Sequence, residues 1–277
     1  MMSILNEFNL EGKVAVVTAG GGILGGAIAC GLGEAGATVV IADIQLEKAA
    51  EVADRISEAG GKALAVVMDV FDRESIEAAA QYVMESLGSI DILVNGVGGN
   101  SPKATTNAEQ SFFDIPADAI KWVSDLNFVH GVLIPTQVFA KHMLSNEDGA
   151  SIINISSMNA FRPLTRIVSY SAAKAAVNNF TQWLAVHLAQ EYGPKLRVNA
   201  IAPGFFLTDQ NRYLLVDAET GQPTARGGQI LSHTPQGRYG APEDLAGATV
   251  FLASDAARFV TGIIVPIDGG FSAYSGV

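Results

Sequence analysis

The sequence predicts a single α/β domain built as a three-layer sandwich, with a parallel seven-stranded sheet and helices on both faces. Two observations carry this prediction. Seven short apolar runs recur along the 277 residues, and segments of helical periodicity separate them. The apolar runs are continuous instead of alternating with polar residues, which is typical of strands buried on both faces. Because no linker, repeat or low-complexity segment divides the chain, residues 1–277 are expected to form one domain.

The elements follow in order along the chain. The expected strands are rich in β-branched and aliphatic residues, and they lie at residues 13–18, 38–42, 63–67, 91–95, 151–155, 197–201 and 263–267. Residues 46–59 and 72–87 are charged on one face and apolar on the other, which predicts amphipathic helices, the second capped by Asp72. Residues 170–192 predict a long helix, and Pro242 with two following acids predicts the start of another.

Composition and charge limit the kinds of partner that we expect this protein to bind. The chain carries 17 basic and 28 acidic residues, a net charge of −11, which opposes binding to nucleic acids or anionic membranes. Residues 14–33 form an uncharged stretch long enough to span a bilayer, but seven glycines within it favour a strand, a turn and a helix. The first eight residues do not have the pattern of a secretory signal. Cys30 is the one cysteine, so we expect no disulfide, no metal site and a cytoplasmic location.

Two long polar segments interrupt the α/β alternation. Residues 98–117 and 205–240 each follow the carboxyl end of an expected strand. Ligands bind at this edge of open α/β sheets, and long loops in compact domains are often binding loops. We therefore expect both segments to act as substrate loops.

A glycine-rich turn, TAGGGILGG from Thr18 to Gly26, joins the first expected strand to the first expected helix. Glycines let the backbone approach a phosphate, and the start of the helix attracts its charge. This context predicts a Rossmann-type dinucleotide site. Asp43 ends the second strand, where a carboxylate binds a ribose diol and repels a 2′-phosphate, so the cofactor is expected to be NAD. The alternative is that Asp43 only caps the turn into the next helix.

The strongest catalytic pattern combines Ser157, Tyr170 and Lys174. Tyr170 and Lys174 are four residues apart on an expected helix and therefore share one face. A neighbouring ammonium is expected to lower the pKa of the tyrosine, which then exchanges a proton with the substrate. Ser157, at the end of the preceding strand, is expected to bind the reacting oxygen.

With these motifs the chain resembles the short-chain dehydrogenase/reductase family. The resemblance extends over nearly the whole chain and includes Asp69-Val70, residues 95–98, residues 199–204 and residues 268–270. It implies that Asn127 completes a proton relay through a water and that the protein is a homotetramer. The residues expected to bind the cofactor are Gly20, Gly22, Ile23, Leu24, Gly25, Asp43, Asp69, Val70, Asn95, Gly96, Tyr170, Lys174, Pro203, Gly204, Phe206 and Thr208. For Asp69, contact with adenine and a plain turn role both stay open.

The chain departs from the family pattern at two places. In the glycine turn, Ala19 and Ile23 replace two glycines. After Asn127, the family's glycine at the third position is His130, and Gly131 follows one residue later. Either a one-residue helical bulge keeps Asn127 in the site, or a shifted register places Phe128 there.

A narrower resemblance points to the mannonate oxidoreductase branch of the family, in segments such as SSMNAFRP (156–163) and APGFFLTDQN (202–211). It implies an NAD-dependent exchange between the secondary alcohol of a sugar acid and its keto acid, foremost D-mannonate and D-fructuronate. Gluconate 5-dehydrogenase is the alternative activity, and a redox sensor that binds NAD without turnover is the alternative of another class. The expected substrate residues are Asn100, Lys103, Ser157, Asn159, Arg162 and Arg212, and Gln210 offers a further polar group.

Overall fold

The computed structural model describes residues 3–208 and 211–276. Its sheet has seven parallel strands in the order β3-β2-β1-β4-β5-β6-β7, which confirms the predicted fold class. The strands are β1 (Val14–Thr18), β2 (Thr38–Asp43), β3 (Lys62–Val67), β4 (Ile92–Asn95), β5 (Ala150–Ile155), β6 (Leu196–Pro203) and β7 (Ile264–Ile267). The strand order reverses between β1 and β4, and a ligand crevice forms at such a point.

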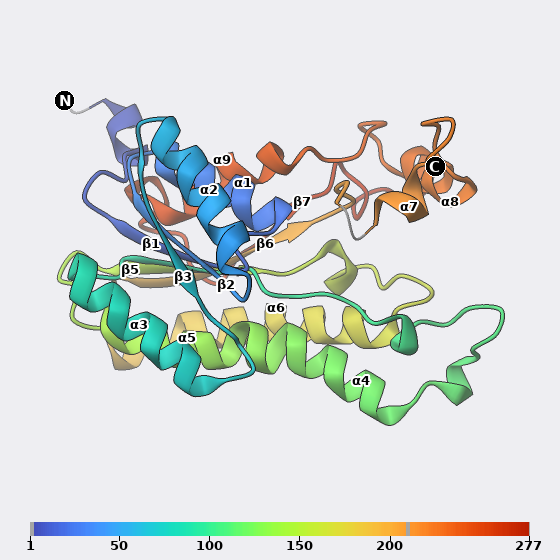
Figure 1. The fold of residues 1–277 in the computed structure, drawn as a ribbon, viewed down its shortest axis with the longest axis horizontal. Helices are drawn as coiled ribbons and strands as arrows, with labels where there is room; N and C mark the ends of the chain where they lie inside the picture. Colours follow the sequence, from blue (N-terminus) through green and yellow to red (C-terminus); the bar gives the residue numbers. More distant parts are fainter. Residues whose placement is uncertain (1–2, 209–210, 277) are drawn as a thin grey trace.

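Helices cover both faces of the sheet, as predicted (Figure 1). One layer contains α1 (Ile23–Glu34), α2 (Leu46–Glu58) and α9 (Ala246–Ala253). The other contains α3 (Arg73–Leu87), α4 (Ala117–Ser124), α5 (Ile134–Met143) and α6 (Val168–Glu191). Asp72 caps α3 as expected, since its Oδ1 accepts a hydrogen bond from the Glu74 backbone at 3.0 Å.

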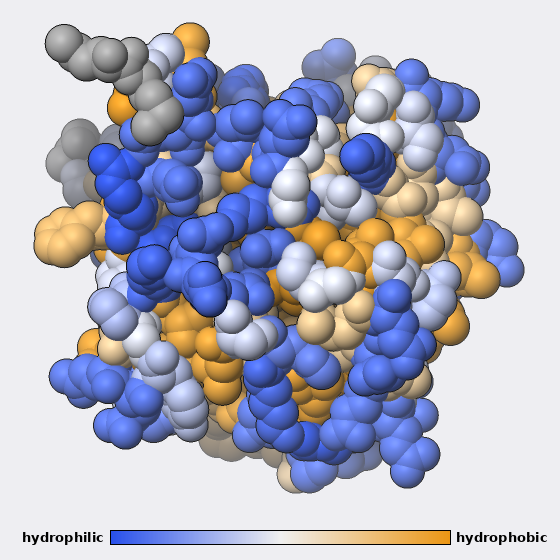
Figure 2. Space-filling view, turned by 90° about the vertical axis from the view of Figure 1, so that its left-hand side faces the viewer, coloured by the Kyte–Doolittle hydropathy of each residue, from blue (hydrophilic) through white to orange (hydrophobic). Residues whose placement is uncertain are grey.

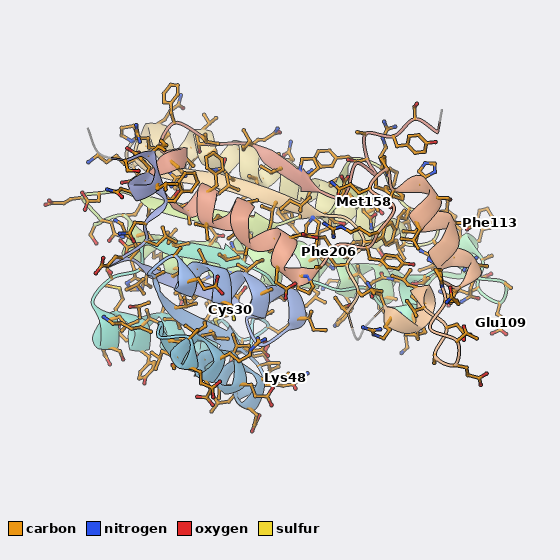
Figure 3. The ribbon with its side chains drawn as sticks, turned by 90° about the horizontal axis from the view of Figure 1, so that it is seen from above. Cys30, Lys48, Glu109, Phe113, Met158 and Phe206 are labelled. Atoms are coloured by element: carbon orange, nitrogen blue, oxygen red, sulfur yellow. The ribbon has the colours of Figure 1, made fainter. Side chains whose placement is uncertain are left out.

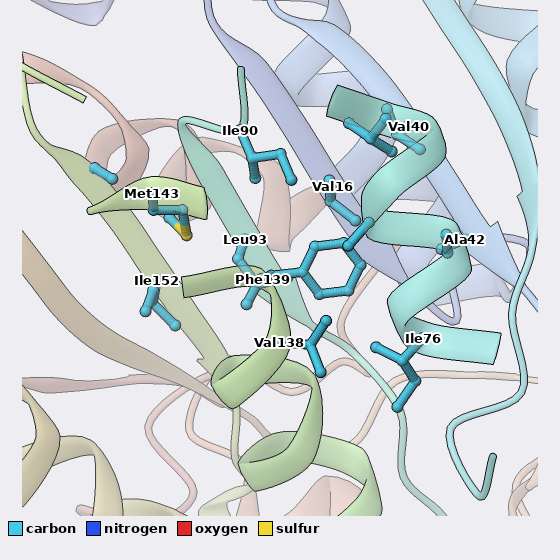
Figure 4. Packing of buried hydrophobic residues seen from close by; sticks show 14 of the residues in the cluster. Val16, Val40, Ala42, Ile76, Ile90, Leu93, Val138, Phe139, Met143 and Ile152 are labelled. Carbon is cyan, nitrogen blue, oxygen red and sulfur yellow. The ribbon is translucent and has the colours of Figure 1, made fainter. Parts of the chain in front are cut away.

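The core lies on both sides of the sheet. Val16 belongs to the cluster under α3 and α5, whereas its neighbours Ala15 and Val17 belong to the cluster under α1 and α2. The fully buried Phe139 ring fills the space between α5, α3 and the sheet (Figure 4). Burial on both faces explains why the strands are continuously apolar.

The uncharged stretch at residues 14–33 forms β1, the glycine turn and α1, as the glycines indicated. Within residues 3–208 and 211–276, no helix has the length and apolar character needed to cross a membrane.

Residues 98–117 and 205–240 lie at the same end of the molecule (Figure 1). The first segment contains two short 3₁₀ turns, Pro102–Ala104 and Phe112–Asp114. The second is more structured than the sequence suggested, because it contains α7 (Arg212–Leu215) and α8 (Ala225–His233). Glu109 and Phe113, both in the first segment, lie at the outer edge of the molecule (Figure 3). At the opposite end of the molecule, hydrophilic side chains are interspersed with hydrophobic patches (Figure 2).

Candidate active site

Ser157, Tyr170 and Lys174 meet at the carboxyl end of β5. Tyr170 lies in the first turn of α6, and the Lys174 Nζ is 5.8 Å from the centre of its ring. Ser157 directly follows β5 and forms a side-chain hydrogen bond with Tyr170. The Ser157 Oγ also accepts a hydrogen bond from the Asn159 backbone at 3.2 Å. Its single hydroxyl hydrogen is directed to the Tyr170 oxygen, because this hydrogen bond lowers the Tyr170 pKa.

The neighbouring Ser156 has a different role. Its Oγ donates to the Asn178 Oδ1 and so ties the end of β5 to α6. Ser157, and not Ser156, is therefore the serine that bonds Tyr170.

Lys174 is 3% exposed, and its Nζ donates a hydrogen bond to the Ile155 carbonyl at 2.8 Å. Burial disfavours the ammonium and lowers the pKa of Lys174 to about 8. The residue therefore still carries most of its charge at pH 7.

The expected lowering of the Tyr170 pKa was wrong for this structure. Tyr170 is partly exposed, yet the surrounding protein desolvates its hydroxyl. This desolvation raises the pKa of Tyr170 above 10.0. The hydrogen bond from Ser157 lowers the same pKa, but by less. The reason is physical: the phenolate loses hydration, whereas the ammonium of Lys174 is directed to the Ile155 carbonyl. The phenol is thus the favoured form.

Asn127 lies in a π-helical segment, Asp125–Leu133, that joins α4 to α5. Its side chain is fully buried; Oδ1 accepts from the Gly99 backbone N–H at 3.1 Å, and Nδ2 donates to the Gly99 carbonyl at 2.6 Å. The Phe128 ring packs against Phe180 instead, with centroids 5.7 Å apart. The π-helical segment thus has the form of the expected bulge, and it directs Asn127, not Phe128, to the loop after β4.

Gly98 lies against both Asn127 and Lys174. A Cβ on Gly98 would be 2.7 Å from the Asn127 Oδ1 and 2.9 Å from the Lys174 Nζ. Gly131 in turn lets the π-helical segment approach the loop after β4, since a Cβ there would be 2.8 Å from the Val97 carbonyl. Asn127 and Lys174 thus lie on the same glycine, and Lys174 lies beside Tyr170 and Ser157. The four expected catalytic residues are therefore in one site.

The turn before α1 fits the pyrophosphate of a dinucleotide. At Gly22, the N-cap of α1, no side-chain cap forms, and the first turn of α1 contains no acidic residue. The first N–H groups of α1 are therefore free of a capping side chain and can bind an anion. A Cβ on Gly25 would be 2.3 Å from the Ala19 carbonyl, which makes glycine necessary there. Ala19 has a φ of 52°, a left-handed conformation that its side chain disfavours. Ala19 thus occupies the conformation that a glycine would take more easily.

Asp43 contacts both the glycine turn and the start of α2. Its Oδ2 accepts from the Gly21 N–H at 3.1 Å, and its Oδ1 accepts from the Gln45 N–H at 3.0 Å. The bond expected for a capping residue is therefore present. A carboxylate has about four acceptor sites, so it retains capacity for a ribose diol.

The loops after β3 and β4 contain four of the residues expected to bind the cofactor, and their side chains have different surroundings. The Asp69 Oδ1 accepts from the Phe71 N–H at 2.9 Å, as in an ordinary turn, and Val70 is buried. The fully buried Asn95 donates to Thr136 and Asn154, so its side chain belongs to the interior. A Cβ on Gly96 would be 2.4 Å from the Thr18 carbonyl. Any cofactor contact at residues 95–96 would therefore involve the backbone.

At the end of β6, too, the residues expected to bind the cofactor have different surroundings. Pro203 ends the strand, and Gly204 packs so closely on Asp268 that a Cβ there would be 2.6 Å from the Asp268 Cβ. Phe206 is 3% exposed, and its ring lies against Gly240, so this side chain packs in the core (Figure 3). The Thr208 N–H donates to the Asn211 Oδ1 at 2.9 Å.

The expected substrate residues do not form one cluster. The Arg162 Nε donates to the Ser272 carbonyl at 3.2 Å, so the C-terminal segment reaches this edge of the site. The Asn100 Nδ2 donates to the Thr105 Oγ1, and the Lys103 side chain is exposed. Asn159 is 6% exposed with no hydrogen-bond partner for its Oδ1 among the described residues. Arg212 lines a separate open cavity on α7, and Gln210 lies outside the described residues.

A second cavity, of about 360 Å³, lies between the loop after β6 and the turn at residues 268–270. None of the four expected catalytic residues lines it. In the described ranges, no group of three or more metal-binding side chains could hold an ion.

A buried polar network was missed by the sequence analysis. Asn95 bonds Asn154, whose Nδ2 donates to the Thr181 Oγ1 at 2.9 Å, and this network ties β4 and β5 to α6. The available signal was an asparagine in the apolar strand SIINI, since a fully buried amide requires partners.

The fold and the site define an oxidoreductase that binds a dinucleotide at the reversal of the strand order. A family model described as enoyl-(acyl carrier protein) reductase matches residues 20–272. The chain belongs to the short-chain dehydrogenase/reductase family, and it is accordingly an oxidoreductase of alcohol and keto groups that uses a nicotinamide dinucleotide.

Similar proteins include an uncharacterized oxidoreductase of Haemophilus influenzae, 47% identical over 100% of this chain and 99% of that protein. A crystal structure of a proposed D-mannonate oxidoreductase from Haemophilus influenza with bound NAD has a TM-score of 0.90 and 46% identity, and covers 99% of this chain and 100% of that chain. The 2-dehydro-3-deoxy-D-gluconate 5-dehydrogenase of Dickeya dadantii is 35% identical over 98% of this chain and 99% of that protein. The structure of this similar protein contains NAD, the cofactor that the sequence predicts for this chain.

Proposed function

We propose that this protein is an NAD(H)-dependent oxidoreductase that interconverts the secondary alcohol of a sugar acid and its keto acid, with D-mannonate and D-fructuronate as the substrate pair. The observation that carries the chemistry is the contact of Ser157 with Tyr170 beside Lys174, in the same site as Asn127.

Each residue has a role that follows from its contacts. A bound nicotinamide supplies or accepts the hydride. The Tyr170 hydroxyl transfers the proton, and its raised pKa favours the phenol that donates to a keto acid. When the substrate is bound, Ser157 donates its hydroxyl hydrogen to the reacting oxygen, which then lies beside the Tyr170 hydroxyl. Lys174 binds the nicotinamide ribose and supplies positive charge, and Asn127 holds the relay water against the loop after β4.

The preference for NAD rests on Asp43. Its carboxylate lies at the glycine turn and would repel a 2′-phosphate. The bound NAD of the Haemophilus influenza structure supports this choice.

The sugar-acid substrate rests on polar groups near the site and on two relatives. Arg162 is a guanidinium suited to a carboxylate, and the Asn159 amide oxygen has no partner within residues 3–208 and 211–276. The D-mannonate and 2-dehydro-3-deoxy-D-gluconate activities ascribed to relatives are both sugar-acid chemistry. Gluconate 5-dehydrogenase activity remains the second candidate for the same reason. Homotetramer formation and a cytoplasmic location belong to the proposal as well.

The test is NADH oxidation at neutral pH with D-fructuronate, beside 5-ketogluconate, a steroid ketone and an NADPH control. We expect rapid turnover of fructuronate with NADH and little with NADPH. Turnover of 5-ketogluconate alone would replace the substrate and retain the mechanism. NADH binding without any turnover would favour a redox sensor.

The matched variant is Tyr170→Phe, which keeps the ring and removes the hydroxyl. It should lose turnover by about 100-fold or more while NADH fluorescence still reports binding. Retained activity in this variant would exclude Tyr170 as the proton donor.

A further inference from the structure

His130 occupies the position at which the family pattern has a glycine, and the function proposed above does not use it. The residue lies in the π-helical segment Asp125–Leu133 and is partly buried. Its Nδ1 is 3.1 Å from the Val70 carbonyl oxygen, and its ring packs against Phe71 at a tilt of 31°, with centroids 4.5 Å apart. His130 therefore joins the helix to the loop after β3.

The direction of this hydrogen bond follows from its partner. A carbonyl oxygen only accepts, so the Nδ1 of His130 carries the hydrogen. The contact is consequently a hydrogen bond donated by the helical segment to the backbone of the loop after β3.

The other side-chain bonds of this loop come from its own neighbourhood. The Asp69 N–H donates to the Ser75 Oγ at 3.0 Å, and the Phe71 N–H donates to Asp69. Among the described residues, His130 supplies a side-chain contact from another helical segment of the same layer. The same segment holds the loop after β4 through Asn127 and Gly99. One π-helical segment thus contacts the loops after β3 and β4, both at the carboxyl edge of the sheet.

We infer that His130 is a positioning residue for the adenine end of the cofactor, acting through the Val70 carbonyl and the Phe71 ring. This inference rests on the proposed function and on the expectation from the sequence that Asp69 and Val70 bind the cofactor, with adenine at this loop. With the donor present, the loop is held in its binding conformation before the cofactor arrives, which reduces the ordering cost of binding.

The test compares His130→Phe, which keeps the ring on Phe71 and removes the donor, with His130→Gln, which keeps a donor. His187→Phe is the control, because His187 also stacks on aromatic rings, 4.7 Å from Trp183, but lies toward the far end of α6. Calorimetry measures binding of NADH and of ADP-ribose, which has the adenine end without nicotinamide, and thermal melting monitors the fold.

We expect His130→Phe to weaken NADH and ADP-ribose by the same factor, about 3- to 10-fold, the loss of one hydrogen bond. The KM for NADH should rise while kcat stays unchanged. His130→Gln should recover most of the affinity, and His187→Phe should bind as wild type does.

Unchanged ADP-ribose affinity in His130→Phe would overturn the inference, as would an equal loss in His187→Phe or a loss of kcat at constant KM. These outcomes leave the proposed function intact, because wild-type turnover is measured separately. Failure of the wild type to bind NADH would overturn both.

Discussion

At the scale of single residues, the site depends on groups whose charge is costly to bury. Lys174 is enclosed beside β5, and its pKa is lowered to about 8. The Tyr170 pKa is raised by the same loss of hydration. The two shifts have one cause and opposite signs because burial favours the neutral form of each group.

The lowered pKa of Lys174 makes a prediction about stability. The folded pKa of about 8 lies below the ordinary value of 10.5, so the unfolded chain binds more protons between these values, and stability gains with rising pH. The free energy of unfolding of the wild type, minus that of Lys174→Met, should rise by about 1.4 kcal/mol per pH unit above pH 8. Urea denaturation from pH 7 to pH 10 measures this difference. Parallel curves for the two proteins would contradict the lowered pKa.

Ala19 makes a second prediction at this scale. Its φ of 52° costs about 1–2 kcal/mol for a residue with a side chain, whereas glycine loses about 0.5–1 kcal/mol of backbone entropy. Ala19→Gly should therefore stabilise the protein by about 0.5–1 kcal/mol in thermal or urea unfolding. Ala35→Gly is the control, because Ala35 has a φ of −77° and gains nothing from the change. Stabilisation by both variants would show that strain is not the cause.

At the scale of elements, the carboxyl end of α9 depends on a buried cation. Arg197 on β6 is 8% exposed and donates to the carbonyls of Leu252, Ala253 and Ser254 at 2.7, 3.3 and 3.2 Å. Helix ends leave carbonyls without partners, and a cation there also interacts favourably with the helix dipole. The contact fixes α9 to the sheet.

Arg197→Met should consequently destabilise the protein by about 3 kcal/mol, since three buried carbonyls lose a charged donor. The measurement is the free energy of unfolding in urea. Arg258→Met is the matched control, because this exposed arginine pairs with Glu7 on the surface and should change stability by less than about 1 kcal/mol. Equal effects of the two substitutions would contradict the role of Arg197.

At the scale of the whole molecule, one helical face remains uncovered. Trp183 and Val186 on α6 are 55% and 57% exposed, and Trp122 on the adjacent α4 is 45% exposed. The exposure of both tryptophans excludes a place for them in the core. Burial of this face between subunits would stabilise an assembly by removing apolar surface from water.

If this face is a contact of the proposed homotetramer, sedimentation analysis should show the tetramer for the wild type and smaller species for the double variant Trp183→Glu and Val186→Glu. Two charges in an apolar interface lack partners and oppose association. Tyr82→Glu, on α3 and 47% exposed, is the control and should leave the assembly unchanged. A wild-type monomer at micromolar concentration would contradict the prediction.

Much of the molecule could be predicted from local patterns. The seven strands, the capped helix α3 and the glycine turn each depend on neighbours in sequence, so periodicity and turn residues indicate them directly. The predicted boundaries differ from the observed ones by one or two residues, as for β6, which extends to Pro203. The helices α7 and α8 were missed because residues 205–240 lack a clear apolar period.

The sequence by itself determined the fold class, the dinucleotide turn and the grouping of Ser157, Tyr170 and Lys174, because spacing along strands and helices sets which residues share an edge or a face. Only the tertiary structure decided the π-helical register of Asn127, the inward direction of Asn95 and the raised pKa of Tyr170. These three properties depend on partners far away in the chain, on hydrogen bonds that buried amides must find and on water removed from a hydroxyl.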